Sequence, residues 1–318
     1  MTTFVIRRLL WTIPVLWAVA TITFLLMHAV PGGPFTQEKD LPEAIELALA
    51  RRYNLDKSLP EQYGLYMWNL VHGDMGLSFR GDQDVADLIS QGFFITAQLG
   101  VLGFGFAVVL GMGLGILSAL NQNGPGDYLG VVFATLGASL PSFILASFLI
   151  IIFSIQLGWV GTLGWGGPGD PGDIFNFSEY DPKRMILPVI AVSVLPAAFM
   201  ARVTRAALLE VLRQDYIRTA KSKGLAERTV IMRHALKNAM IPVLTLMGPL
   251  AANLVTGSFI IETTFQIPGI GRGFVDAVVR RDYAMIMGTT IFYAAVVAMA
   301  NLVVDLMYGA VDPRIRYN

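Results

Sequence analysis

The sequence predicts an all-α membrane protein with six transmembrane helices, a small external domain between the first and second helices, and a cytoplasmic helical segment between the fourth and fifth. Hydrophobic residues make up 54% of the 318 residues and charged residues only 14%, against about 25% charged residues in soluble domains. A cluster of basic residues separates the fourth and fifth apolar segments, which is typical of a cytoplasmic loop. The six apolar segments, each long enough to cross a bilayer, are residues 9–30, 94–120, 128–158, 185–207, 239–261 and 284–309.

Residues 1–30 are expected to form a cytoplasmic N-terminus and the first transmembrane helix. Arg7 and Arg8 precede an apolar segment that contains no charged residue. A cleaved signal peptide is the alternative, because Ala18-Val-Ala20 resembles a cleavage site. The segment continues well past that point, whereas the apolar part of a signal peptide spans only about 7–15 residues. We therefore expect an uncleaved helix that crosses a hydrocarbon core of about 30 Å.

Residues 31–93 are predicted to form the external domain. Pro31-Gly-Gly-Pro34 ends the first helix, and the polar segment that follows contains ten acidic and five basic residues. The spacing of its apolar residues predicts two short helices, at 42–53 and 59–71, the second with Pro60 near its start.

Residues 94–318 contain the remaining five predicted transmembrane helices. The first of these carries glycines at 100, 103, 105, 111, 113 and 115. Gly111 and Gly115 have the small-xxx-small spacing that lets helices approach closely in lipid. A nucleotide-binding glycine loop is the alternative, but the segment is apolar with helical spacing and lacks the G-x-G-x-x-G pattern. A short external or re-entrant helix is expected within residues 262–282, after a Pro-Gly turn.

The distribution of basic residues predicts that both termini are cytoplasmic. Arg7 and Arg8 precede the first helix, nine basic residues lie between 202 and 237, and Arg314 and Arg316 follow the last helix. All three groups lie on the cytoplasmic side if there are six spans. Three arginines in the external segment 263–283 oppose this assignment mildly.

The sequence contains no recognisable catalytic motif. It has no Gly-Lys dipeptide and so no Walker A loop, and neither H-E-x-x-H nor G-x-S-x-G occurs. There is no cysteine, and the three histidines are too scattered for a metal site. The largely uncharged interiors of the predicted helices also argue against a proton- or ion-coupled carrier. We therefore expect no enzyme activity, and we expect any energy for transport to come from another protein.

The most strongly charged segment, residues 208–238, is predicted to be a folded cytoplasmic element. Residues 208–222 are expected to continue the fourth membrane helix, Gly224 to end it with a positive φ angle, and 226–236 to form a second short helix. A solvated basic loop that only fixes the topology is the simpler interpretation. The glycine between two helices favours an element on which a partner protein docks. The basic residues from 213 to 237 are Arg213, Arg218, Lys221, Lys223, Arg228, Arg233 and Lys237.

Several motifs resemble those of ABC importer permeases. The segments Tyr216-Ile-Arg-Thr-Ala-Lys-Ser-Lys-Gly-Leu225 and Arg233-His-Ala-Leu-Lys-Asn-Ala-Met-Ile-Pro242 are similar to the EAA loop of that family. Further matches lie in order along the chain, among them Pro31-Gly-Gly-Pro-Phe35, Pro268-Gly-Ile-Gly271 and Asp312-Pro-Arg314. Together they resemble the B-type subunit of the oligopeptide/dipeptide branch over nearly the whole chain.

The resemblance implies that the EAA segment is a coupling helix that sits in a cleft of a cytoplasmic ATPase. Ala220, Gly224 and Leu236 match the alanine, glycine and leucine of the motif, whereas Arg218-Thr219 replaces its Glu-Ala and Lys237 stands where many sugar permeases have proline. The residues assigned to ATPase coupling are Asp215, Tyr216, Arg218, Ala220, Lys223, Gly224, Leu225, Arg228, Arg233 and Leu236. An external gate or binding-protein docking site is assigned to Glu262, Pro268, Gly269 and Gly271.

The resemblance also implies the partners of the chain. These are a second, homologous permease subunit, two cytoplasmic ATPase subunits that bind the ATP, and an external solute-binding protein that delivers peptide. The expected location is the inner membrane of a bacterial cell, in contact with lipid, with no cofactor of its own and no nucleic acid. Nickel or a sugar is the alternative solute, because related permeases carry these. An ATPase-independent channel or secondary carrier is the alternative mechanism.

Overall fold

A computed structural model describes residues 2–30, 43–79, 82–166 and 181–311. Within these ranges the chain is helical, with one isolated β-bridge between Leu77 and Asp84 and no β-strand. It divides into two compact units, here called unit 1 (residues 1–95 and 268–299) and unit 2 (residues 96–267 and 300–318). Five of the described helices are long and apolar enough to cross a membrane, and a bent pair of helices brings the number to six if it counts as one span.

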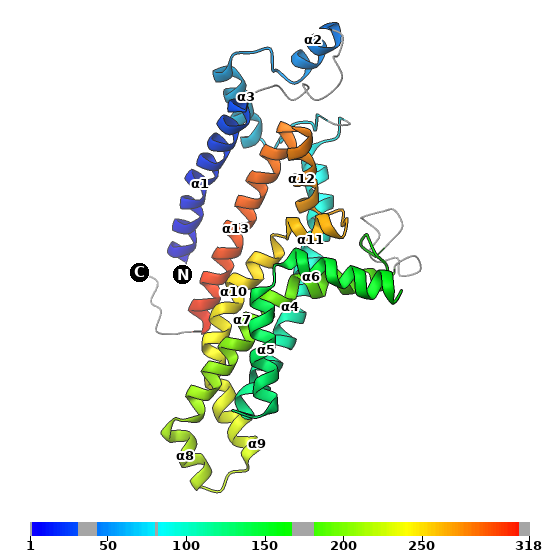
Figure 1. Ribbon diagram of the computed structural model, residues 1–318. Coiled ribbons are helices and arrows are strands. Elements are labelled where there is room, and N and C mark those ends of the chain that lie inside the picture. The colour runs from blue at the N-terminus through cyan, green and yellow to red at the C-terminus, as the bar shows by residue number, and fades with distance from the viewer. Residues whose placement is uncertain (1, 31–42, 80–81, 167–180, 312–318) are drawn as a thin grey trace. The chain divides into compact units, whose positions relative to one another are not determined.

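Unit 1 contains the N-terminal helix α1 (Thr2–Ala29) and the two short helices that follow it (Figure 1). These are α2 (Glu43–Arg52) and α3 (Leu59–Val71), which confirm the helices expected at 42–53 and 59–71. The first twelve residues of the predicted external domain, 31–42, lie outside the described residues. Hydrogen bonds tie α1 to α3, from Thr21 to Tyr63 at 2.7 Å and from His28 to Gln62 at 3.0 Å.

The core of unit 1 forms where the first turns of α4 (Val85–Leu120) meet α12 (Ile270–Arg280) and the start of α13 (Tyr283–Val311). Val85, Ile89 and Ile270 are almost completely buried in this cluster. The helix predicted to begin at 94 therefore begins nine residues earlier, because tertiary packing orders a segment whose composition is polar. With 36 residues α4 is about 54 Å long, well beyond the thickness of a hydrocarbon core.

Unit 2 is built on α7 (Lys183–Leu212), which packs against α5 (Pro125–Ser139) and α10 (Leu236–Val255). The prediction that the glycines of α4 allow close helix contact is confirmed for four of them. A Cβ atom on Gly100 would lie 2.4 Å from the carbonyl oxygen of Leu254 in α10, and one on Gly111 would lie 2.6 Å from that of Ala197 in α7. Gly103 and Gly115 are similarly crowded, whereas Gly105 and Gly113 face open space.

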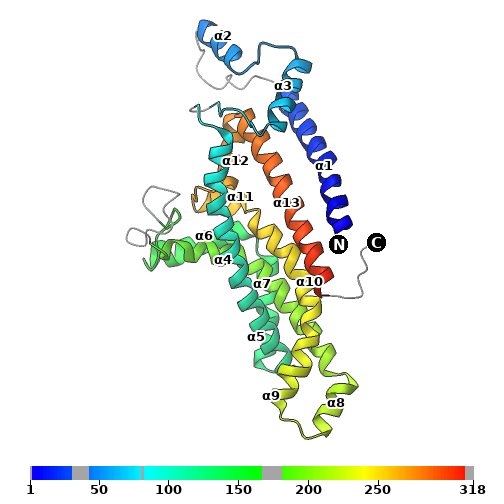
Figure 2. The same ribbon diagram turned by 180° about the vertical axis from the view of Figure 1, so that it is seen from behind.

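The single third membrane helix expected at 128–158 is wrong, because the chain bends sharply in the middle of this segment. Helix α5 ends at Ser139, and α6 (Ser142–Leu149) with its π-helical continuation η1 (Ile150–Gln156) leaves at an angle of 107°. Figures 1 and 2 both show α6 turning away from α5. The bend lies at Leu140–Pro141, where Leu140 is extended. Proline lacks an amide hydrogen and disfavours the helical conformation of the preceding residue.

The fourth membrane helix does not continue to residue 222 as expected. Helix α7 ends at Leu212, and a separate helix, α8 (Asp215–Ser222), follows after a break of two residues. The second short helix expected at 226–236 is instead the beginning of a longer one. Helix α9 (Glu227–Thr229), the π-helical segment η2 (Val230–Ala235) and α10 form one unbroken helix, Glu227–Val255. Helix α12 lies within the segment 262–282, where one short helix was expected, and α11 (Phe259–Thr264) precedes it.

Candidate functional site

Helix α8 is amphipathic, and two of its side chains fix it to the rest of unit 2. Ile217 is 1% exposed and Ala220 is 7% exposed, one turn apart on the same face. Both belong to a buried cluster that also takes in Leu208 of α7 and Val230 of η2. Most of the other members are alanines, which let the helices approach closely: Ala119, Ala207, Ala235 and Ala239. The buried face of α8 is therefore held between the end of α7 and the start of the helix Glu227–Val255 (Figures 1 and 2).

The opposite face of α8 is polar and open to solvent. The Asp215 and Arg218 side chains are 96% and 74% exposed, and 3.5 Å separates their nearest charged atoms. Because both side chains are so exposed, the pair contributes less than about 1 kcal/mol to the stability of the fold. Lys223, Gly224 and Leu225 follow directly and are exposed as well, Leu225 at 42%. This face and the turn after it thus present charged groups and one apolar side chain without using them in the fold.

Gly224 ends α8 in a Schellman motif. Its φ angle is +75°, as the sequence predicted, and its amide donates to the carbonyl of Lys221 at 3.0 Å. The amide of Leu225 donates to the carbonyl of Ala220 at 3.4 Å, which completes the pattern of a left-handed helix end. Because a Cβ atom at Gly224 would have no neighbour within 4 Å, only the backbone conformation requires glycine here.

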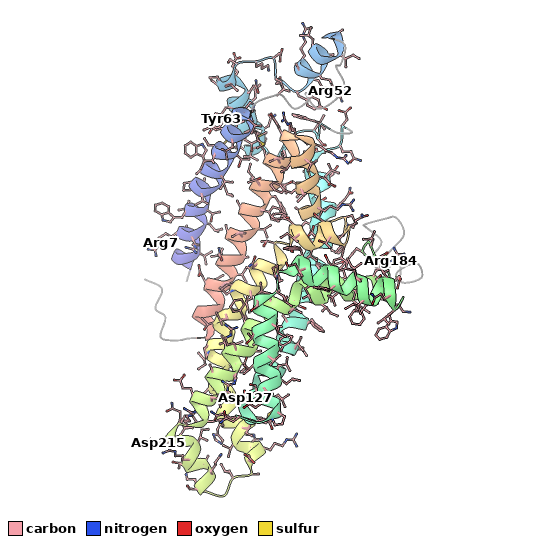
Figure 3. All side chains as sticks on the ribbon, viewed as in Figure 1. Arg7, Arg52, Tyr63, Asp127, Arg184 and Asp215 are labelled. Atoms are coloured by element: carbon pink, nitrogen blue, oxygen red, sulfur yellow. The ribbon has the colours of Figure 1, made fainter. Side chains whose placement is uncertain are left out.

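A hydrogen bond joins α8 to the following helix. Asn238 donates from Nδ2 to the Tyr216 hydroxyl at 2.8 Å, and Leu236 packs against the alanine-rich cluster while partly buried. Arg228 and Arg233 lie on the same long helix with exposed side chains. The structure thus brings all ten predicted coupling residues to one end of unit 2, where Ala220 is buried, Leu236 is partly buried and the other eight are exposed. Figure 3 labels Asp215 at this end.

Sequence reasoning missed an ion pair that holds three helices together beside α8. Arg205 of α7 donates to the carboxylate of Asp127 in two bonds, Nε to Oδ1 at 2.7 Å and Nη2 to Oδ2 at 2.8 Å. Ser118 of α4 also donates to Asp127, and the amide of Asn123 donates to its Oδ2 at 2.9 Å. Such bidentate pairs are among the strongest polar contacts in proteins. Asp127 and Asp215 both lie toward the end of unit 2 that carries α8 (Figure 3).

The signal for this pair was the presence of Arg202 and Arg205 inside an apolar helix. Ionisable residues in a membrane helix normally have a partner, yet these two arginines were counted among the nine basic residues that mark the cytoplasmic side. Arg202 instead donates from Nη2 to the carbonyl of Ala134 at 3.2 Å and lies over the ring of Phe199. The partner of Arg205 is 78 residues away in the sequence, so spacing alone did not reveal it.

The four residues assigned to the external gate are divided between the two units. Glu262 belongs to α11 in unit 2 and is completely buried, and its Oε1 accepts a hydrogen bond from Thr96 of α4 at 3.0 Å. Pro268, Gly269 and Gly271 belong to unit 1, where Gly269 precedes the first turn of α12. Of these three only Pro268 is exposed. Their grouping into one gate stays a prediction.

Comparison with known proteins identifies the family of the chain. Residues 111–317 match the family described as binding-protein-dependent transport system inner membrane component, and residues 1–100 match the N-terminal family of the same membrane components. The chain is 41% identical over 315 residues to the oligopeptide transport system permease protein OppB of Haemophilus influenzae, with 99% of both chains covered. It is 40% identical over 317 residues to the dipeptide transport system permease protein DppB of Bacillus subtilis, with 99% of this chain and 98% of the relative covered.

Solved structures support the same fold at lower identity. An inward-facing structure of the MetNI methionine ABC transporter matches with a TM-score of 0.55 and 16% identity, over 71% of this chain and 96% of the matched chain. An amino acid ABC transporter matches with a TM-score of 0.54 and 14% identity, over 71% and 94% of the two chains. Since its two family matches together extend over nearly the whole chain, the protein belongs to the inner membrane components of binding-protein-dependent transport systems.

Proposed function

We propose that this chain is the transmembrane permease subunit of an ATP-driven importer of short peptides. Relatives of 40–41% identity over almost the full length are named as oligopeptide and dipeptide permeases. The chain contains no Walker A motif, so ATP hydrolysis belongs to two cytoplasmic ATPase partners. A second, homologous permease completes the translocation path, and an external solute-binding protein delivers the peptide.

One observation carries the proposed mechanism of coupling. Helix α8 lies between the end of α7 and the start of the helix Glu227–Val255, with Ile217 and Ala220 buried and the opposite face exposed. A force on the exposed face is therefore transmitted to two long membrane helices through closely packed side chains. Such a lever fits the hinge-type motion by which ATPase closure would move the permease.

The charges around α8 indicate the kind of surface that it contacts. Exposed lysines and arginines outnumber exposed acidic residues between 213 and 228, with only Asp215 and Glu227 on the acidic side. The basic residues are Arg213, Arg218, Lys221, Lys223 and Arg228. We therefore expect the matching ATPase cleft to be acidic, with an apolar recess for Leu225, because complementary charge increases the rate and specificity of association.

Substitution of Gly224 tests the coupling mechanism. A β-branched residue in the left-handed region costs about 1–2 kcal/mol, and no side-chain clash complicates the change. Gly224→Val should therefore reorient the end of α8 and reduce the stimulation of ATP hydrolysis by binding protein and peptide, while the chain still inserts into the membrane. The measurement is ATP hydrolysis and peptide uptake by the complete complex in proteoliposomes.

The matched control is Gly224→Asn, because asparagine tolerates the left-handed conformation better than other residues do. This variant should keep most of the coupling. Normal stimulation of hydrolysis in the Gly224→Val complex would show that the shape of this turn does not matter, and would remove α8 from the mechanism.

Two further experiments address the partners and the solute. Affinity purification in mild detergent should recover a second permease and two ATPase chains, whereas a homo-oligomer without ATPase would favour a channel or secondary carrier. Uptake of labelled dipeptide, nickel and sugar by the same complex then separates the three solute classes. Uptake of nickel or sugar without peptide would contradict the proposed substrate.

We also propose that both termini and α8 lie in the cytoplasm and the segment 31–93 outside the cell. The chain contains no cysteine, so single cysteines introduced at exposed positions can be labelled without background. In intact cells with a permeabilised outer membrane, a membrane-impermeant maleimide should label Trp68→Cys in α3 and leave Lys223→Cys, directly after α8, unlabelled. The reverse pattern would invert the topology.

A further inference from the structure

Unit 1 contains a cavity of about 470 Å³ that the coupling mechanism does not use. Its walls come from the end of α1, the turn after α2, one side of α3, the loop around the β-bridge and the start of α13. The volume falls within the range of roughly 300–1,000 Å³ that small-molecule sites occupy. Figure 3 shows the upper part of unit 1, with Arg52 of the cavity wall labelled.

Aromatic rings form two facing groups in the cavity wall. In the first group, Phe24 lies 4.1 Å from the ring of His28 and 5.8 Å from that of Tyr66, with which it stacks. In the second group, the rings of Tyr53 and Phe79 are 4.4 Å apart, and Phe79 is 6.1 Å from Tyr283. His28 and Tyr283 are 5.8 Å apart and join the two groups. Rings in such an arrangement contact a flat or bulky apolar side chain well.

Tyr66 lines the cavity and carries a buried hydroxyl without a hydrogen-bond partner among the described residues. Burial raises the pKa of Tyr66 well above its usual value, so the group stays a neutral donor and acceptor. A buried polar group without a partner costs free energy.

The charges in the cavity wall favour a cation. Among the described residues of the wall Arg52 is the one arginine, and it is already paired with Asp82, at 2.8 Å between Nη2 and Oδ2. Asp74 and Asp84 each use Oδ1 to accept a backbone amide, from Gly76 and Ala86, both at 2.8 Å. Their second carboxylate oxygens make no bond with the described residues and leave two negative charges in the wall.

We propose that this cavity binds the first residue of a peptide, with a large aromatic or apolar side chain between the rings and the terminal ammonium beside Asp74 and Asp84. The inference rests on the proposed function, because it takes the solute to be a peptide. It adds a preference for a free amino terminus and for a bulky first side chain, held by the permease itself.

Photo-cross-linking tests the site directly. The probe is the dipeptide p-benzoyl-phenylalanyl-alanine, added to the permease complex in lipid nanodiscs without the binding protein. After irradiation and digestion, mass spectrometry should locate adducts in the fragments that contain residues 24–28, 62–66 or 283–287. The N-acetylated probe, which lacks the ammonium, should label these fragments about fivefold less, as expected when one charged contact is lost.

Matched variants separate a specific site from general affinity for an apolar surface. Asp84→Asn keeps an oxygen that accepts the amide of Ala86 but removes the charge, and should reduce labelling by the free probe about fivefold. The control, Asp87→Asn, changes an exposed carboxylate three residues away, in the first turn of α4, that does not line the cavity, and should have no effect. Equal labelling by both probes, or adducts only elsewhere in the chain, would overturn the proposal.

Uptake by the same complex distinguishes this inference from the proposed function. If peptide is transported but the cavity fragments are never labelled, the site is wrong and the function stands. If the cavity is labelled with the expected preference for a free ammonium while the complete complex transports no peptide, the site is supported and the peptide-import assignment is wrong.

Discussion

Unit 2 joins its helices through glycine and alanine, whereas much of unit 1 is joined through aromatic rings and hydrogen bonds. In unit 2 the backbone of α4 approaches α7 and α10 so closely that single Cβ atoms at Gly100 and Gly111 would collide with carbonyl oxygens. In unit 1 the rings of Phe24, Tyr66 and Tyr283 surround a cavity.

This difference in packing matches two different tasks. Close backbone contact leaves little free volume, so that a displacement of α8 moves α7 and α10 without being absorbed by rearranging side chains. The aromatic rings of the wall meet in tilted, stacked and edge-to-face pairs around an open space, which suits the binding of a ligand. We propose that the end of unit 2 that carries α8 transmits a movement and that the cavity in unit 1 accepts a molecule.

The largest effect is expected at the glycines of α4. Gly111→Val would place a branched side chain 2.6 Å from the carbonyl oxygen of Ala197. This oxygen belongs to the backbone of α7 and cannot move aside by changing rotamer. The loss of folding free energy should therefore be larger than is usual for overpacking, which is about 1–3 kcal/mol. We expect little or no folded protein in fluorescence-detected size-exclusion chromatography. Gly113→Val, two residues away and facing open space, is the control and should accumulate normally; equal loss in both variants would contradict close packing.

The next effect concerns the ion pair in unit 2. Asp127→Ala leaves the Arg205 guanidinium, whose side chain is only 30% exposed, without its carboxylate. Breaking such a pair from one side costs on the order of 3 kcal/mol, and the melting temperature of the purified protein should fall accordingly. Asp215→Ala removes a carboxylate that is 96% exposed and should leave the melting temperature unchanged. A melting temperature unaffected by Asp127→Ala would show that the pair does not hold α4, α5 and α7 together.

A smaller effect is expected from two tyrosines of α3. Tyr63→Phe removes the hydrogen bond of 2.7 Å to Thr21 of α1, which should cost about 1 kcal/mol. Tyr66→Phe removes a buried hydroxyl that has no partner among the described residues and should be neutral or slightly stabilising. Thermal unfolding of the two variants side by side provides the measurement. A greater loss for Tyr66→Phe would mean that its hydroxyl has a partner in the folded protein.

The smallest effect is a pH dependence at the start of α3. The Glu61 carboxylate accepts hydrogen bonds from the Ser58 hydroxyl at 2.9 Å and the Ser58 amide at 3.1 Å, and these bonds lower the pKa of Glu61. Because the pKa is lower in the folded state, the stabilisation is present above about pH 4.3, the usual value for glutamate, and is lost as the pH falls through the lowered pKa. Hydrogen exchange of residues 59–64, corrected for intrinsic rates, should therefore accelerate in acid for the wild type. In Glu61→Gln this additional acceleration should be absent, and its persistence would argue against the capping interaction.

Local signals predicted the parts of the fold that depend on a few neighbouring residues. The helices at 42–53 and 59–71 follow from apolar spacing, and the left-handed turn at Gly224 follows from one glycine after a helical segment. Close packing at Gly111 and Gly115 was likewise expected from their spacing. For the two short helices and the turn, the free energy that decides the conformation comes from residues within one or two turns, whereas the partner of Gly111 and Gly115, helix α7, lies far away in the sequence.

The features that were missed depend on residues far apart in the chain. The bend at Leu140–Pro141 lies inside a continuous apolar segment. The hydrophobicity of a segment indicates that it lies in lipid, but it does not indicate the direction in which the helix runs. The early start of α4 is stabilised by contacts of Val85 and Ile89 with residues around 270 and 285.

The sequence by itself thus determined the membrane class of the protein, most of its helices, and the charged segment from which the coupling role was inferred. The tertiary structure decided the pairing of Asp127 with Arg205, the burial of Glu262 and the formation of the cavity in unit 1. Composition and periodicity describe the environment of each residue along its own helix. Which helices meet, and at which residues, depends on side-chain volumes and charges that come together only when the chain has folded.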